Sequence, residues 1–171
     1  MQRDTVTFVE TAAESGGART LVEVELAPGG GTPPHVHRTF AEHFEALDGT
    51  LSLQLGRVVR RLAPGERATA PAGVLHRFFN ETAAPIRFRV ELRPGRVGAE
   101  HALRIAYGLA CDGRVRRSGV PAELSHIAVL FALGESDLPG GFGIARPLLG
   151  WLARRARRRG VERELVARYC T

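Results

Sequence analysis

The stretch of sequence that decides the fold is GGGTPPHVHRTFAEHFEALDG, residues 29–49. It places His35 and His37 two positions apart, and residues with this spacing on an extended chain point to the same side. Glu42 follows five residues after His37, and Asp48-Gly49 is typical of a hairpin turn. Imidazole nitrogens and a carboxylate suit Fe, Mn, Ni, Cu or Zn. The His-x-His pair alone also fits an exposed loop with two polar rings, so it does not by itself establish a metal site.

Around this stretch the hydrophobic pattern alternates with the period of two that is typical of strands. Val22, Val24 and Leu26, for example, lie on one face of such a segment. The expected strands are residues 5–9, 21–26, 43–47, 51–55, 58–62, 67–70, 76–80 and 86–92. Short strands at this spacing predict a β-sandwich or barrel over residues 1–95.

After Pro94-Gly95 the pattern changes to the period of a helix. The expected helices are residues 99–111, 121–133, 147–159 and 161–169. We expect residues 96–171 to pack on the barrel as a helical extension within one structural domain. The same helices are a candidate dimer contact, and a homodimer is the expected assembly.

Composition narrows the class of protein. The chain has 171 residues, of which 44% are hydrophobic and 25% charged, and this is the composition of a globular protein. It contains no apolar run of the length that a membrane span needs and no secretory signal, so we expect a cytoplasmic protein. Cys111 and Cys170 are too few for a disulfide scaffold.

The net charge of +6 lies entirely in residues 146–171, which carry eight Arg and two Glu. The body of the chain is therefore neutral, and we expect no nucleic-acid partner. The third expected helix is amphipathic. Its apolar side carries Leu149, Leu152 and Ala156, its opposite side carries Arg154, Arg155, Arg157, Arg158 and Arg159, and Trp151 lies near the border. We favour a helix that packs on the barrel through its leucines, with its arginines solvated or paired to acidic residues of the body, because the apolar side is small for membrane binding; contact with an anionic membrane surface is the alternative.

Two stretches of the chain resemble the motifs of the cupin family. The first motif, G-x5-H-x-H-x4-E-x6-G, is filled by Gly29, His35, His37, Glu42 and Gly49. The second motif, G-x5-P-x-G-x2-H-x3-N, is filled by Gly65, Pro71, Gly73, His76 and Asn80. The resemblance covers roughly residues 20–93. The helices that follow are similar to those of a subgroup of small bacterial cupins.

The resemblance implies a mainly β fold, a cupin jelly-roll barrel followed by C-terminal α-helices. It also implies one divalent transition metal ion held by His35, His37, Glu42 and His76. Glu42 is the candidate catalytic residue, since in some family members the carboxylate is proposed to leave the metal and act as a base.

The alternation of strand residues predicts what surrounds these ligands. Phe44 and Ala46 share the inward face with Glu42, whereas His43 and Glu45 point outward. The candidate substrate-pocket residues are Phe40, Phe44, Gln54 and Phe78. For Gln54 an alternative stays open, in which its neighbours Leu53 and Leu55 are the inward residues.

These observations favour a metal-dependent enzyme that acts on a small organic molecule, with oxidoreductase chemistry of the dioxygenase kind. One alternative is a non-redox isomerase or cyclase at the same site. A second is a barrel that binds a small ligand without turning it over, and a third is an interaction protein that uses the Arg-rich helix. The sequence contains no nucleophilic triad and no phosphate-binding loop that would favour another enzyme class.

Overall fold

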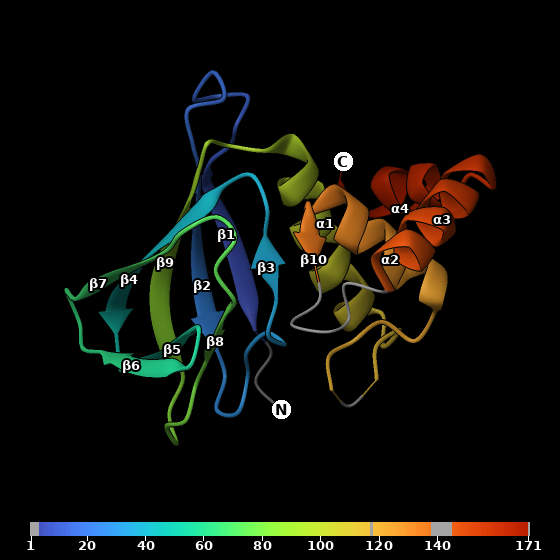
Figure 1. Cartoon of the computed structure of the whole chain (residues 1–171). Helices are drawn as coiled ribbons and strands as arrows, with labels where there is room; N and C mark the ends of the chain where they lie inside the picture. The colour runs from blue at the N-terminus through green and yellow to red at the C-terminus, as the bar shows by residue number, and fades with distance from the viewer. Residues whose placement is uncertain (1–3, 117, 138–144, 171) are drawn as a thin grey trace. The chain divides into compact units, whose positions relative to one another are not determined.

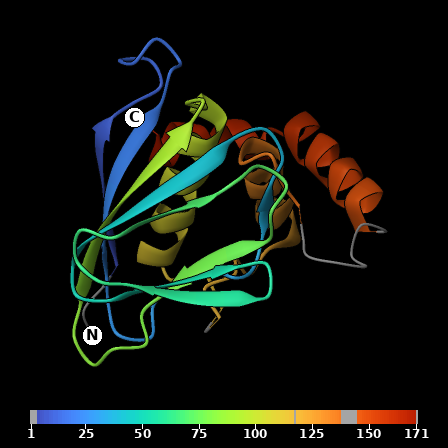
Figure 2. The same cartoon turned by 60° about the vertical axis from the view of Figure 1, so that its left-hand side comes forward.

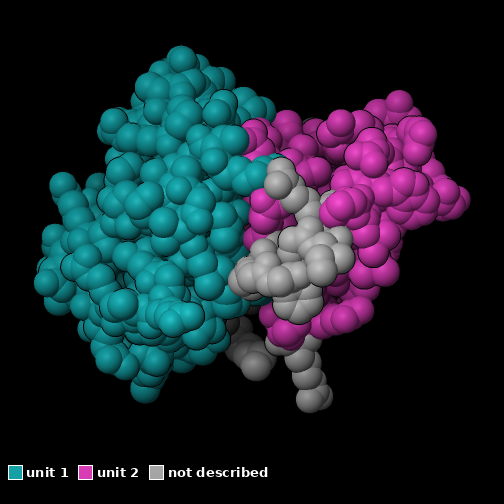
Figure 3. Space-filling model, viewed as in Figure 1, with its two compact units in different colours: residues 1–97 teal, residues 98–171 magenta. Residues whose placement is uncertain are grey.

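A computed structural model of the chain describes residues 4–116, 118–137 and 145–170. The chain divides into two compact units, residues 1–97 and residues 98–171 (Figure 3). Unit 1 is built of strands and unit 2 mostly of helices (Figure 1). The expected mainly β fold followed by helices is confirmed, and the packing of the helices on the barrel stays a prediction.

Unit 1 contains two antiparallel sheets. Its strands are β1 (Thr5–Glu10), β2 (Thr20–Leu26), β3 (Val36–His37), β4 (Ala41–Asp48), β5 (Leu51–Leu55), β6 (Val58–Leu62), β7 (Arg67–Ala70), β8 (His76–Phe79) and β9 (Ile86–Arg93). The larger sheet has the order β1-β2-β9-β4-β7 and the smaller has the order β6-β5-β8. The two sheets face each other (Figure 2), and the ring of Phe78 on β8 lies 6.1 Å from that of Phe44 on β4 and 5.0 Å from that of Phe88 on β9.

The core between the sheets follows from strand alternation. Along β9 every second residue is buried, from Ile86 to Leu92, while Arg87 between them is exposed. β2 shows the same pattern, and its Val24 pairs with Phe88 of β9. Each such side chain contributes about 1.5–3 kcal/mol when it leaves water, so the alternating pattern fixes which face of each strand turns inward.

The turn at Asp48-Gly49 does not close a hairpin, and this corrects the expectation from sequence. β4 pairs with β7 and β9, and β5 pairs with β6 and β8. The turn therefore carries the chain from one sheet to the other. Gly49 has φ +73°, and a Cβ atom there would lie 2.5 Å from Cγ2 of Ile86, so both the backbone and the packing require glycine.

Unit 2 contains the helices α1 (Val97–Cys111), α2 (Leu124–Leu133), α3 (Ala145–Arg158) and α4 (Val161–Tyr169), with the short strand β10 (Ser136–Asp137). Its core is formed by Ile105, Leu109, Val129, Ala156 and Leu165. The predicted start of the second helix at Pro121 is wrong. Pro121 instead forms a β-bridge with Val115, and the helix begins three residues later. In the part of the chain that the structure describes, no helix is both long enough and apolar enough to cross a membrane.

Candidate metal centre

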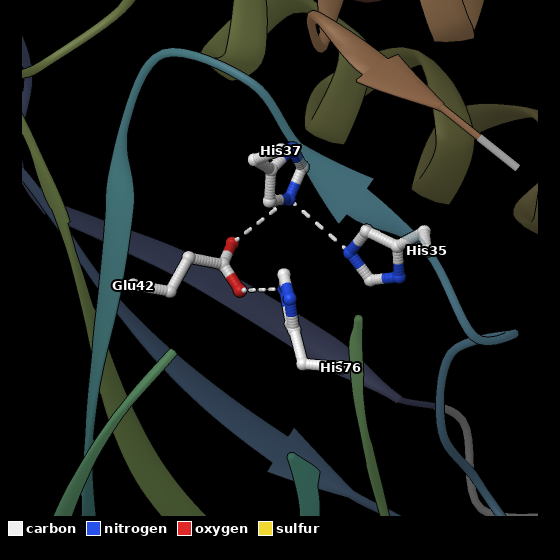
Figure 4. A group of neighbouring side chains, drawn as sticks. All are labelled: His35, His37, Glu42 and His76. Carbon is white, nitrogen blue, oxygen red and sulfur yellow. Dashed lines mark hydrogen bonds and ion pairs between the residues drawn. The ribbon is translucent and has the colours of Figure 1, made fainter. Parts of the chain in front are cut away.

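Four side chains from the two sequence motifs converge on one point in unit 1 (Figure 4). His37 belongs to β3 and His35 lies just before it, Glu42 is in β4, and His76 is the first residue of β8. Each offers one ligand atom, and these atoms all lie within 4.8 Å of one another. The structure thus brings together all four residues that the resemblance to cupins nominates.

Backbone hydrogen bonds join the segments that carry the histidines. His35 N–H donates to the carbonyl of His76 at 3.0 Å, and His76 N–H donates to the carbonyl of His35 at 2.9 Å. Gly73 N–H donates to the carbonyl of His37 at 2.8 Å. These bonds fix the relative positions of the two motifs, although His35 and His76 are far apart in the sequence.

The ligand atoms form a chain of close contacts. Nε2 of His35 lies 3.1 Å from Nε2 of His37, and Nε2 of His37 lies 3.4 Å from Oε1 of Glu42. Oε2 of Glu42 lies 3.0 Å from Nε2 of His76. Each carboxylate oxygen therefore faces a different imidazole, and the carboxylate lies between the two.

The hydrogen bonds of Nδ1 in His35 and His76 show which ring nitrogen carries hydrogen. Nδ1 of His35 donates to the carbonyl of Pro33 at 2.8 Å, and Nδ1 of His76 donates to the carbonyl of Val74 at 2.9 Å. A carbonyl oxygen only accepts, so each Nδ1 carries hydrogen, and in the neutral ring the lone pair is on Nε2, directed at the centre of the cluster.

This donor set fits a divalent transition metal ion. Three imidazole nitrogens and a carboxylate oxygen are ligands of intermediate softness, and hydrogen bonds from the outer ring nitrogens are the usual way in which metal-bound histidines are oriented. Two nitrogen lone pairs 3.1 Å apart repel each other unless a proton or a metal ion lies between them.

The electrostatics of the cluster are consistent with a cation site. Burial, and then the positive charge of neighbouring His37, lower the pKa of His35 to about 4, which keeps this ring neutral at physiological pH. Burial acts to raise the pKa of Glu42, but His37 and His76 outweigh it and hold the pKa well below its usual range. For His76, burial lowers the pKa, while the hydrogen bond to Glu42 and its charge raise it, and the net shift is upward.

Aromatic side chains pack behind the ligands. Phe40 is 1% exposed and its ring stacks on the imidazole of His37 at a centroid distance of 4.2 Å. The ring of Phe44 lies 6.5 Å from that of His76. Phe78 contacts Phe44 rather than a ligand ring. The predicted inward direction of Phe44 and Ala46 is confirmed, since both are 1% exposed.

Gln54 is directed away from the cluster, contrary to the pocket role suggested from sequence. It pairs across the sheet with Arg77, and its Oε1 accepts a hydrogen bond from Nε of Arg77 at 2.8 Å. Leu55 pairs with His76, and Leu53 with Phe78. Since directly paired residues share a face, the two leucines lie on the inward side, which was the alternative left open above.

Sequence reasoning missed the backbone partners of the ligands. The carbonyls of Pro33 and Val74 each lie two residues before a histidine that they orient. No side-chain pattern encodes a carbonyl contact. Phe88, which contacts both Phe44 and Phe78, lies in the expected strand 86–92, but alternation gives the face of a strand residue and not its neighbours.

Comparisons with known proteins agree with the fold of unit 1. Residues 22–92 match the Cupin domain family. A probable oxidoreductase, patJ, from Aspergillus clavatus is 32% identical over 74 residues, which are 43% of this chain and 23% of the relative. The patJ protein of Penicillium expansum matches with the same identity and coverage. The chain therefore spans about a quarter of the length of these relatives.

Two solved structures share the fold at low sequence identity. KdgF from Halomonas sp. superposes with a TM-score of 0.50 at 20% identity, covering 55% of this chain and 81% of that one. A predicted oxalate decarboxylase from Thermotoga maritima has a TM-score of 0.50 at 17% identity, covering 53% of this chain and 80% of that one. Residues 22–92 thus match the Cupin domain family and have the two-sheet fold of these structures, they contain the cluster of three histidines and one glutamate, and a helical segment follows them.

Proposed function

We propose that this protein is a metal-dependent oxidoreductase that acts on a small organic molecule, with one divalent transition metal ion held by His35, His37, Glu42 and His76. The observation that carries this proposal is the convergence of three imidazole nitrogens and a carboxylate oxygen on one point, with ligand atoms within 4.8 Å of one another. The 32% identity to proteins named as probable oxidoreductases supports the redox assignment, although it extends over only 23% of their length.

The residues of this chain have separate roles in the proposed site. A bound ion of this kind supplies Lewis-acid or one-electron chemistry. His35 and His76 hold their Nε2 atoms inward through their bonds to the carbonyls of Pro33 and Val74. Phe40 and Phe44 place apolar surface beside the histidines, which keeps water from the ligand rings on that side.

Glu42 is the candidate catalytic residue. Its depressed pKa keeps it ionised, as a metal ligand needs to be, and an ionised carboxylate is also the form that can accept a proton from a substrate. This second role supports an alternative function, a non-redox isomerase or cyclase in which proton transfer to Glu42 is the central step. A barrel that binds its ligand without turning it over would use the same histidines. It would need Glu42 neither as a metal ligand nor as a proton acceptor.

Metal analysis of purified protein tests the proposal. Protein prepared without chelator or immobilised nickel is expected to contain about one equivalent of metal, and the His35→Ala/His76→Ala variant is expected to contain none. His43→Ala is the matched control, because His43 lies next to Glu42 but bonds to Thr69 on the other face of β4. Redox-active metal with oxygen uptake in the presence of substrate supports the oxidoreductase. Stoichiometric zinc favours the non-redox alternative, and failure to bind any metal after anaerobic reconstitution contradicts both.

A further inference from the structure

Helix α3 uses its apolar side inside unit 2. Ala153 is 9% and Ala156 3% exposed, and the helix packs against α2 and α4. Leu149 and Leu152 on the same side are half-buried. The apolar side is thus occupied by the neighbouring helices α2 and α4, whereas the sequence predicted packing on the barrel, and any partner of α3 meets its opposite side.

That opposite side is not purely charged. Leu148 is 58% and Trp151 45% exposed. Arg154, Arg155 and Arg158 follow at spacings of three and four residues and are also exposed. Residues with these spacings share one stripe of a helix. We call Leu148, Trp151, Arg154, Arg155 and Arg158 the α3 outer face; its first turns are apolar and its last turns are cationic.

Among the residues that the structure describes, the arginines of the α3 outer face have no acidic partner. Within the described part of the chain, no carboxylate lies within 4.0 Å of the guanidinium of Arg154, Arg155 or Arg158. Arg157, by contrast, pairs with Glu162 at 2.9 Å. The guanidinium carbon of Arg155 lies 5.6 Å from the centre of the Trp151 ring. This contact places a cation beside the single aromatic ring of the helix.

We propose that the α3 outer face docks on an anionic lipid surface, with Leu148 and Trp151 in the headgroup region and the three arginines on lipid phosphates. This role is independent of the proposed chemistry in unit 1. Exposed leucine and tryptophan gain free energy when they enter the interface of a bilayer, where tryptophan is enriched. Arginines extend their chains along apolar surface and place their charge at the phosphates. A nucleic acid would use the arginines but would give no place to Leu148, so the lipid surface is the better fit.

The chain supplies its own reporter for this contact, since Trp151 is its single tryptophan. Full-length protein is mixed with vesicles of phosphatidylcholine alone or with about 30% phosphatidylserine. We expect co-sedimentation and a blue shift of Trp151 emission with the anionic vesicles only. Brominated acyl chains are expected to quench the same emission, because the headgroup region in which we place the ring borders the acyl chains.

Two matched triple variants test whether vesicle binding depends on the α3 outer face or only on the net charge of the protein. Arg154→Gln/Arg155→Gln/Arg158→Gln removes three charges from the α3 outer face and keeps the reporter. Arg57→Gln/Arg60→Gln/Arg87→Gln removes three charges from exposed positions in unit 1. We expect the first variant to bind anionic vesicles about a hundredfold more weakly, at roughly a factor of five per arginine. The second variant should bind as the parent protein does, and Leu148→Gln should bind anionic vesicles more weakly with a smaller blue shift.

Three results would overturn the proposal. Equal loss in the two triple variants would mean that only net charge matters. Vesicle binding without any change in Trp151 emission would place the contact elsewhere on the protein. Binding to a single-stranded oligonucleotide at the same salt concentration, with no binding to vesicles, would assign the face to nucleic acid instead.

Discussion

The ring of Phe40 stacks on the imidazole of His37, with centroids 4.2 Å apart and ring planes 28° apart. Phe40 is 1% exposed, so its ring has no room to swing away. The stack restricts rotation of His37 and holds its Nε2 toward His35 and Glu42. Phe40 is therefore a positioning residue for the candidate metal centre.

Phe40→Leu should weaken metal binding by about tenfold, because contacts that orient a ligand are worth roughly 10–100-fold in affinity. Phe88→Leu is the control, since Phe88 is 0% exposed and contacts Phe44 and Phe78. Both variants should lose similar stability in urea, but only the first should bind metal more weakly in a competition titration with a coloured chelator. Equal metal affinities of the two variants would show that Phe40 is only a core residue.

Gly49→Ala should destabilise unit 1 more than Gly56→Ala does. Both glycines have positive φ, +73° and +58°, so each alanine costs about 1–2 kcal/mol in backbone strain. At Gly49 the new methyl group would also lie 2.5 Å from Cγ2 of Ile86, whereas at Gly56 nothing lies within 4 Å. The clash adds about 1–3 kcal/mol. Urea unfolding of the two variants measures the difference, and equal losses would contradict the close approach of the turn to β9.

Asn80→Ala should destabilise the protein by about 1–3 kcal/mol and leave its metal content unchanged. Asn80 is 2% exposed, and its Nδ2 donates to the carbonyls of Leu26 and Ala84, while its Oδ1 accepts from Thr82 N–H. Asn80→Asp removes both N–H donors and should cost more at pH 7 than at pH 4, where the new carboxyl group is partly protonated. Urea unfolding and metal analysis measure the two effects. Loss of metal at unchanged stability would instead connect Asn80 with the ligands.

His126 should make the stability of unit 2 depend on pH. Burial, with help from Arg114, lowers the pKa of His126 below 6.5, and the charge of Glu123 only partly opposes this shift. Below pH 6.5 the unfolded chain therefore takes up a proton more readily than the folded one, and stability is lost as the pH falls. The melting temperature of His126→Gln should fall less between pH 8 and pH 5 than that of the parent. Identical pH profiles would contradict this assignment.

The sequence predicts most of the site because strands alternate strictly. Glu42, Phe44 and Ala46 are two residues apart, so the face of one determines the face of all. The same alternation leaves the direction of the Gln54 side chain undecided. Alternation leaves two choices for a strand whose residues are all apolar or uncharged, as in Leu51–Leu55, and only the pairing of Leu55 with His76 decides between them.

Other features depend on contacts that no local pattern contains. The Asp48-Gly49 turn has the composition of a hairpin, yet tertiary packing places its two strands in different sheets. β3 is two residues long and too short for periodicity to reveal. The apolar part of the α3 outer face was missed because helical spacing identifies a stripe, whereas the exposure of Leu148 and Trp151 depends on which stripe the neighbouring helices cover.

The mutual backbone hydrogen bonds of His35 and His76 have a consequence in coordination chemistry. A flexible chain that gathers four donors around an ion loses conformational entropy at the moment of binding. Here strand pairing has already brought the donors of both motifs together, so that entropy is lost during folding. If the proposed metal site is correct, unit 1 would act as a preorganised tetradentate chelator, and an entering cation would have to displace only protons and water.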